Sequence, residues 1–242
     1  DRAPVKVPIA INDVMTGMYA AVAILAALRH RDANSKGQYI DLGLLDVQVA
    51  WLYNQGLNYL TDGQVPQRLG TAHPNTVPYQ AFETADGFII VAANNDEQFK
   101  RFCEFASCKE LLGDPKFATN PDRVRNRDHV AATLAVIIKK HPSQYWIEGL
   151  ERAEVSCCPI NTLDQVFDDP AVLARGMKIS MPHPLAGNDA VDLIGNPIKL
   201  SETPPTYRRP PPTMGQHTDE VLEEVLGLSE DEINDLRIGG LI

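Results

Sequence analysis

Asp13 is the residue whose type and position could most directly do chemistry. It stands directly before the predicted helix 14–29, where free backbone N–H groups and the positive end of the helix dipole favour an ionised carboxylate. An aspartate at such a position commonly serves as a plain helix cap. However, the helix is expected to be buried from its first turns, and Gly17 leaves open space one turn later. A carboxylate held ionised beside such an opening could act as a nucleophile, so both interpretations stay open.

A second candidate is His73, in the segment Gly70-Thr-Ala-His-Pro-Asn75. The turn residues predict a loop, so this histidine is either a hydrogen-bond donor that lines a pocket or a histidine near the surface. No second histidine stands at metal-ligand spacing, and we expect no metal site. Cys157 and Cys158 are adjacent rather than spaced as C-x-x-C, which favours inert thiols. The sequence has neither a Gly-rich phosphate loop nor a G-x-S-x-G motif.

The elements that must position these residues predict an α/β protein. Met18–Leu28 is apolar on every face, so its helix is expected to be buried on all sides, or packed between a sheet and another subunit. A strand at Gln38–Leu42 and a helix at Leu44–Leu60 follow. Asp86-Gly87 between two apolar runs predicts a hairpin of strands 79–83 and 88–93. The remaining expected elements are helices at 96–106, 122–140, 143–153, 162–168, 170–175, 217–226 and 230–237, with extended segments at 177–182 and 191–200.

These elements suggest three parts. Residues 1–75 belong to a large domain, with Asp13 and a linker helix; residues 76–185 form a smaller α+β domain; residues 186–242 return to the large domain. The opening Asp1-Arg2-Ala3-Pro4 is typical of the interior of a longer chain. The length of 242 residues is ample for a buried core.

Composition excludes several partner classes. Lys and Arg number 22 against 32 Asp and Glu, so the net charge of −10 argues against nucleic acid as a partner. The longest apolar run, Met18–Leu28, has eleven residues, short of the roughly 18–20 that span a bilayer, and we expect no membrane association. Four cysteines are too few for a disulfide scaffold. Reduced thiols and a cytoplasmic location are therefore expected.

Four blocks, in order, carry a family resemblance. They are Asn12-Asp13-Val-Met-Thr-Gly-Met18 with Arg29-His-Arg31 and Lys36-Gly-Gln-Tyr-Ile-Asp41; the segment Gly70–Phe82 with Asp86-Gly87; Ala92-Ala-Asn-Asn-Asp-Glu-Gln-Phe99; and Gly215-Gln-His-Thr-Asp-Glu-Val-Leu222. Together they resemble the class III CoA-transferases, the family of formyl-CoA and carnitine CoA-transferases. The resemblance covers nearly the whole chain. It implies the C-terminal part of that fold, with helices of an incomplete nucleotide-fold-like large domain beside the α+β domain.

The resemblance also implies a reaction. Asp13 maps onto the family's catalytic aspartate, which forms an aspartyl-acyl anhydride with an acyl-CoA donor and then an aspartyl-CoA thioester. The acceptor is a small carboxylic acid. Arg68 and Arg209 could pair with the second carboxylate of a dicarboxylic acceptor, or could be ordinary surface arginines. Coenzyme A is then a substrate, with no cofactor beyond the CoA held transiently on Asp13. Substrate contacts are implied for His73, Asn75, Asn94 and Asp96, and family members form interlocked homodimers.

Two departures from the family pattern keep alternatives open. The family's long N-terminal portion, which supplies much of the CoA-binding surface, does not precede Asp13 here, and only one glycine stands where the formyl-CoA type has a run of glycines. An α-methylacyl-CoA racemase of the same family would use Asp13 as a general base, with Asp96 near the second racemase carboxylate. A catalytically inactive fragment that serves only folding or dimerisation is the third hypothesis.

Overall fold

The computed structural model describes residues 4–242, and it begins with one long helix. Helix α1 (Ile11–Asn34) extends past the predicted range at both ends and stops at Ser35, whose φ of 55° is left-handed. Alanine and other strong helix formers dominate its middle, which explains its length. None of its residues is buried. The expectation that this helix is buried on all sides is therefore wrong for this chain, because the described residues supply no surface that covers it; packing against another subunit stays a prediction.

Helix α1 also bears on the expected absence of a membrane segment. Its 18-residue apolar window has a mean hydropathy of 1.6, and none of that window is buried. By length and composition the helix could therefore cross a bilayer, which the count of uninterrupted apolar residues did not indicate. The same two properties describe a helix that packs into a protein interior, so the absence of a membrane segment stays a prediction.

The next segment departs from the predicted strand and helix. Residues 36–43 form no strand in the described chain, because no neighbouring strand is present to pair with their backbone groups. The single helix predicted at 44–60 is two helices, α2 (Leu44–Ala50) and α3 (Tyr53–Asp62). Tyr53 interrupts the helix with a positive φ of 43°, a conformation that a continuous right-handed helix excludes.

The predicted hairpin is confirmed and forms part of a three-stranded antiparallel sheet. Strand β1 (Tyr79–Glu83) pairs with β2 (Phe88–Ala92), with Tyr79 opposite Ala92 and Glu83 opposite Phe88. Strand β3 (Ser156–Pro159) pairs with the other edge of β2. Apolar side chains of β2 point into the core, where Ile89 and Val91 are fully buried. The order β1-β2-β3 therefore places a distant segment beside the hairpin.

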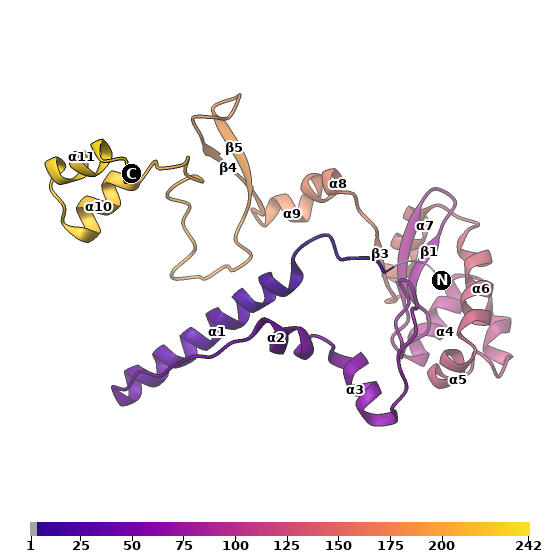
Figure 1. The fold of residues 1–242 in the computed structure, drawn as a ribbon. Helices are drawn as coiled ribbons and strands as arrows, with labels where there is room; N and C mark the ends of the chain where they lie inside the picture. Colours follow the sequence, from indigo (N-terminus) through magenta and orange to yellow (C-terminus); the bar gives the residue numbers. More distant parts are fainter. Residues whose placement is uncertain (1–3) are drawn as a thin grey trace. The chain divides into compact units, whose positions relative to one another are not determined.

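Helices and one 3₁₀ turn pack around this sheet and supply most of the core. They are α4 (Asp96–Phe105), the 3₁₀ helix η1 (Lys109–Gly113), α5 (Asn120–Arg125), α6 (Arg127–Ile138) and α7 (Ser143–Arg152). Helix α6 contacts β1, and α7 contacts β2 and β3 (Figure 1). The predicted helix 122–140 is broken at Asn126, which ends α5 and precedes α6. Trp146 lies at the centre of the core and donates to the Ile138 carbonyl at 2.8 Å.

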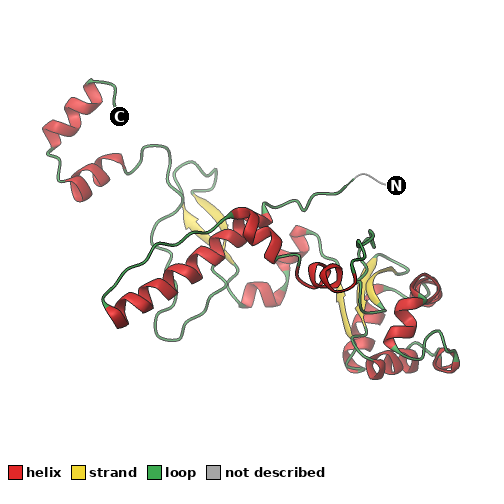
Figure 2. Cartoon of the chain, turned by 60° about the horizontal axis from the view of Figure 1, so that its bottom comes forward, coloured by secondary structure: helices red, strands yellow, loops and turns green. Residues whose placement is uncertain are grey.

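The contacts divide the chain into a first unit that ends at Pro159 and a second unit, Ile160–Ile242. The second unit contains α8 (Leu163–Asp168), α9 (Pro170–Ala174), β4 (Lys178–Pro182), β5 (Ala190–Ile194), α10 (Thr218–Leu226) and α11 (Glu230–Ile238) (Figure 2). Strands β4 and β5 form an antiparallel pair. This pair spans the boundary predicted between residues 185 and 186. The three-part division stays a prediction about the whole fold.

Candidate functional site

Asp13 lies inside the first turn of α1 and not immediately before the helix. The cap position is held by Ala10, which makes no side-chain cap hydrogen bond. The interpretation of Asp13 as the cap residue is therefore wrong, because the helix begins at Ile11. The first turn is nevertheless the positive end of the helix dipole, where acidic side chains stabilise a helix. Asp13 is exposed.

The backbone N–H groups of the first turn of α1 differ in whether they have an acceptor. The Ile11 N–H donates to the Ile9 carbonyl at 2.9 Å, and the Val14 N–H donates to the Ala10 carbonyl at 3.1 Å. Within residues 4–242, the N–H groups of Asn12 and Asp13 have no backbone acceptor. A methyl group added at Gly17 would meet nothing within 4 Å, so the expected open space one turn later is present. Among the described residues, Asp13 thus has no side-chain hydrogen bond or ion pair, and two N–H groups of the same turn lack a backbone acceptor.

The backbone fixes the His73 ring in one orientation. The Asn75 N–H donates to His73 Nδ1 at 3.1 Å, and the ring stacks on Tyr79 with centroids 5.2 Å apart. Because Nδ1 accepts this bond, a neutral ring carries its proton on Nε2. The side-chain amide of Asn54, on α3, lies 3.5 Å from Nε2. Because Nδ1 accepts from the Asn75 N–H, Nε2 is the ring nitrogen of the half-buried His73 that remains to contact a ligand.

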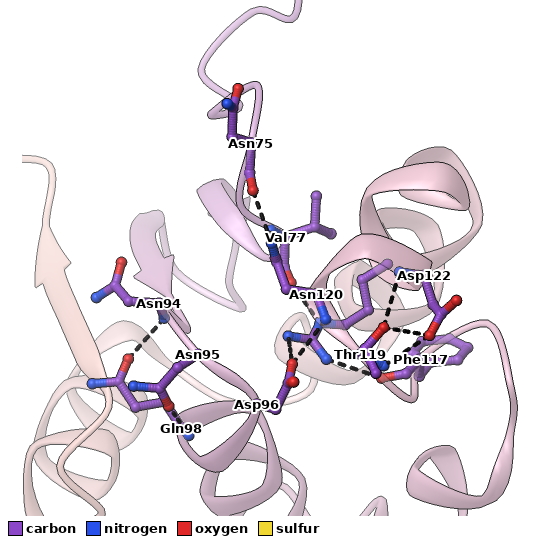
Figure 3. A network of polar contacts seen from close by, with 11 residues as sticks. Asn75, Val77, Asn94, Asn95, Asp96, Gln98, Phe117, Thr119, Asn120 and Asp122 are labelled. Atoms are coloured by element: carbon purple, nitrogen blue, oxygen red, sulfur yellow. Dashed lines mark hydrogen bonds and ion pairs between the residues drawn. The ribbon is translucent and has the colours of Figure 1, made fainter. Parts of the chain in front are cut away.

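Asn75 is held from two sides. Its side-chain amide forms a reciprocal pair with that of Asn58, on α3, at 2.9 and 3.2 Å. Its carbonyl accepts from the Asn120 side chain at 2.8 Å (Figure 3). The carbonyl before it, that of Pro74, accepts from Arg127 at 2.6 Å, as does that of His73 at 2.8 Å. These bonds fasten the loop 73–75 to α3 on one side and to α5 and α6 on the other.

Asp96 is part of the same network through Asn120 and Arg123. Its Oδ1 accepts from the Arg123 guanidinium and from the Asn120 N–H, each at 2.8 Å. Arg123 is fully buried, donates to the Val77 carbonyl at 2.7 Å and the Phe117 carbonyl at 3.0 Å, and lies 4.3 Å from the centre of the Phe99 ring. Asp96 is thus the counter-ion of a buried cation. The hydrogen bonds from Arg123 and Asn120 therefore fix the position of the Asp96 side chain without a substrate.

Asn94 keeps its side chain available. Its N–H donates to Gln98 Oε1 at 2.7 Å, and the next residue, Asn95, caps α4 by accepting from the Gln98 N–H at 2.8 Å (Figure 3). Asn94 is exposed, and none of the hydrogen bonds of the described chain uses its side-chain amide. Of the four residues predicted for substrate contact, Asn94 and His73 therefore present free or weakly held polar groups.

Hydrogen bonds of the described residues connect part of the predicted site. Asn120 donates to the Asn75 carbonyl and to Asp96, and Arg127 donates to the His73 carbonyl. Asn94 lies two residues before Asp96. None of the hydrogen bonds or ion pairs of residues 4–242 connects Asp13 to this group. Groups of three or more His, Cys, Asp or Glu able to hold a metal ion are likewise absent from residues 4–242.

Sequence reasoning missed Asn120, Arg123 and Arg127, which hold the loop in place. A signal was present: Arg123 precedes the buried Val130 by seven residues, so it falls on the apolar side of the helical pattern. A charged residue on an apolar face indicates a buried ion pair. The partner carboxylate, on a different helix, cannot be read from that pattern.

Comparisons with known proteins agree with the sequence blocks. The profile of CoA-transferase family III matches residues 1–218. The succinate–glutarate CoA-transferase of Agrobacterium fabrum is 40% identical over 227 residues, which are 93% of this chain and 56% of that protein. The succinyl-CoA:glutarate CoA-transferase of Homo sapiens is 38% identical over 239 residues, 99% of this chain and 54% of that protein.

The fold agrees as well. The crystal structure of a CaiB/BaiF family protein from Brucella suis superposes with a TM-score of 0.74 and 37% identity, and the match covers 93% of this chain and 57% of that chain. The chain therefore spans about half the length of the relatives it matches. Since the family profile covers most of its residues, this chain belongs to CoA-transferase family III, as its four sequence blocks predicted.

Proposed function

We propose that the protein transfers coenzyme A from an acyl-CoA to a carboxylic acid, and that both acids are small dicarboxylic acids. The observation that carries this proposal is the match over nearly the whole chain to transferases named for succinate and glutarate. A succinyl-CoA:mesaconate CoA-transferase of Haloarcula marismortui, 32% identical, acts by name on the same class of acid. None of these three relatives is named as a racemase. The carboxylate that the racemase alternative would use as its second one, Asp96, forms an ion pair with Arg123.

Asp13 is the nucleophile in this proposal. Its carboxylate attacks the thioester carbonyl of the acyl-CoA, which releases the CoA thiolate and leaves an aspartyl-acyl anhydride. The thiolate then attacks the Asp13 carbonyl, so that the donor acid leaves as its carboxylate and an aspartyl-CoA thioester forms. The acceptor carboxylate attacks this thioester, and the released thiolate takes the acceptor acyl group from the second anhydride. Asp13 ends as the free carboxylate.

The chemistry requires stabilisation of each tetrahedral oxyanion and exclusion of water. The free N–H groups of Asn12 and Asp13 are donors at the right end of α1 for the first requirement. One such donor contributes roughly 3–4 kcal/mol to an acyl-transfer step. Asp13 is exposed, so the proposal requires that another surface covers it during the reaction. A homodimer that covers α1 fits this need, and sedimentation of the full-length protein as a monomer would argue against it.

The loop and α4 supply the acceptor site in this proposal. His73 donates through Nε2–H, since its Nδ1 accepts from the Asn75 N–H, and the exposed amide of Asn94 donates through its NH₂ group; both suit a carboxylate. Asn75 and Asp96 act by holding the loop and the start of α4 in place. The cytoplasmic location stays a proposal; the free state of all four cysteines is compatible with it.

Activity of the full-length protein with succinyl-CoA and glutarate tests the proposal. The variant Asp13→Asn should lose at least about 10³-fold in kcat, because an amide is a poor nucleophile towards a thioester. Asp32→Asn is the matched control, since Asp32 is an exposed residue on the same helix and, among the described residues, forms an ion pair with Arg31 alone. Borohydride added during turnover should reduce the aspartyl thioester and label Asp13. Equal rates for both variants, or solvent deuterium on the acyl α-carbon with Asp13 unlabelled, would reject transfer through Asp13.

A further inference from the structure

Two buried thiols lie against each other at the C-terminal end of α4. Cys103 is fully buried, Cys108 is 2% exposed, and both are free. The Cys108 N–H donates to the Cys103 carbonyl at 2.9 Å, and the Ser107 N–H donates to the Glu104 carbonyl at 3.4 Å. Ser107 has a left-handed φ of 54°. This is the Schellman arrangement, which folds the residue after the left-handed position back onto the last helical turn, so Cys108 lies against Cys103 in the same buried cluster.

One of the two thiols has access to a cavity. A cavity of about 140 Å³ is lined by Cys108, together with Glu110, Lys140, His141 and Tyr145. A water molecule needs about 10–15 Å³ on this measure, so the cavity, at roughly ten times that volume, has room for a small solute such as hydrogen peroxide. Cys103 does not line this cavity and belongs to the apolar core behind it. Cys108 is therefore the thiol that a small molecule reaches first.

The surroundings shift the pKa values of the two thiols in opposite directions. The hydrogen bond from the Cys103 thiol lowers the pKa of Cys108, Lys140 lowers it further, and burial and Glu110 oppose this effect. The same hydrogen bond and burial raise the pKa of Cys103. The thiolate is the reactive form of cysteine. Cys108 is thus prepared as the nucleophile and Cys103 as the proton donor that becomes free after Cys108 has reacted.

We propose that Cys103 and Cys108 form an oxidisable dithiol site that reacts with hydrogen peroxide to give an intramolecular disulfide. The Cys108 thiolate attacks one peroxide oxygen, the O–O bond breaks, and the departing hydroxide takes a proton to become water, which leaves a sulfenic acid on Cys108. Cys103 then loses its proton and attacks the Cys108 sulfur, and a second water leaves. Two thiols are oxidised by two electrons, and one peroxide is reduced to two waters.

The remaining cysteines provide an internal contrast. Cys157 and Cys158 are neighbours on β3, so their side chains point to opposite faces of the strand. Burial raises the pKa of Cys157 to about 12, which leaves it as an unreactive thiol. Cys158 is exposed and unpaired with Cys157. This pair should not form an intramolecular disulfide under the same conditions.

Peptide mass spectrometry of the full-length protein tests the site. Trypsin cleaves after Arg101 and Lys109, so Cys103 and Cys108 fall in one peptide. After exposure to peroxide, quenching and alkylation without reductant, this peptide should lose two hydrogens and lose alkylation at both cysteines together. Cys157 should stay alkylated in the same digest. Reduction should restore both alkylations, because a disulfide is reversible and higher oxides of sulfur are not.

Single variants test the assignment of roles. In Cys103→Ser, dimedone should label Cys108, since the sulfenic acid has no thiol to condense with; in Cys108→Ser, Cys103 should stay unlabelled. Far-UV circular dichroism checks that each variant is folded, and the wild-type experiment needs no variant. Full alkylation of Cys103 and Cys108 at a peroxide dose that oxidises Cys158 would overturn the proposal. So would dimedone labelling of Cys103 in the Cys108→Ser variant that equals the labelling of Cys108 in the Cys103→Ser variant.

Discussion

Replacing Arg123 with methionine tests how the core holds the candidate site. Arg123 is fully buried and donates to the carbonyls of Val77 and Phe117 and to the Asp96 carboxylate. Methionine keeps an unbranched apolar stem of similar length and removes every donor. The side chain of Asp96 is 54% exposed, so water can replace the arginine there. The two buried carbonyls have no such replacement.

The magnitude follows from these contacts. Each buried carbonyl left without a donor costs about 1–3 kcal/mol, and loss of the cation over the Phe99 ring adds about 0.5–2 kcal/mol. Removal of the guanidinium also relieves its own desolvation, which offsets part of the loss. We expect a net loss of about 3 kcal/mol in the free energy of unfolding. A domain with a total stability of about 5–15 kcal/mol would remain folded but clearly weakened.

Arg125→Met is the matched control. Arg125 lies on the same helix, is 67% exposed, and pairs with Asp122 at the surface. Exposed ion pairs contribute about 0–1 kcal/mol, so this variant should lose little stability. The two variants have the same change of side chain and of net charge, and they differ in the burial of the position.

Urea unfolding followed by tryptophan fluorescence measures the difference. The chain has two tryptophans, and a Trp51→Phe background leaves the buried Trp146 as the reporter of this core. With a slope of about 1–3 kcal/mol per M, the midpoint of Arg123→Met should fall by about 1–3 M. Equal midpoints for the two variants would refute the reasoning, because they would show that the buried contacts of Arg123 contribute no more than an exposed pair.

Two further outcomes follow from close contacts and from charge. Gly149→Ala should lower the free energy of unfolding by about 1–3 kcal/mol, because the added carbon would lie 1.8 Å from Phe105 Cζ. Gly113→Ala, where the added carbon meets nothing within 4 Å, should change it by less than about 0.5 kcal/mol in the same thermal unfolding experiment. Similar values for the two variants would contradict this reasoning. The N–H of Ser143, and then its hydroxyl, hold the pKa of Asp86 below its ordinary value. The stability that Asp86 contributes is therefore present above about pH 4 and lost as the pH falls through the lowered pKa, so the difference in unfolding midpoint between wild type and Asp86→Asn should shrink with acidification; a constant difference would contradict it.

Local sequence signals predicted the elements whose causes are local. Asp86-Gly87 fixes a tight turn, and the hairpin 79–92 forms where that turn requires it. The short helices of the second unit likewise lie close to their predicted ranges, and α11 begins with a Ser229–Glu232 capping box. The break at Tyr53 and the break at Asn126 were not predicted, because each depends on the conformation of one residue within an otherwise helical pattern.

Signals that depend on distant partners were not readable. The apolar composition of α1 predicted burial, but burial needs a covering surface that the described residues do not supply. Gln38–Leu42 alternates like a strand yet has no strand beside it to pair with. The residue types of the candidate site were found through the sequence blocks. Their support by Asn120, Arg123 and Arg127 required the three-dimensional contacts between α5, α6 and the loop.

The loop 73–75 connects α3 to the part of the chain that contains the three-stranded sheet, through hydrogen bonds of two different strengths. On the α3 side, its direct amide-to-amide bonds join Asn58 and Asn75, two exposed neutral groups. On the α6 side, the Arg127 guanidinium donates to the carbonyls of His73 and Pro74 at 2.8 and 2.6 Å. Charged donors form stronger hydrogen bonds than neutral ones, so if α3 moves away from the three-stranded sheet, the amide pair Asn58–Asn75 should break first. The loop 73–75, with the His73 ring, would then stay attached to α6.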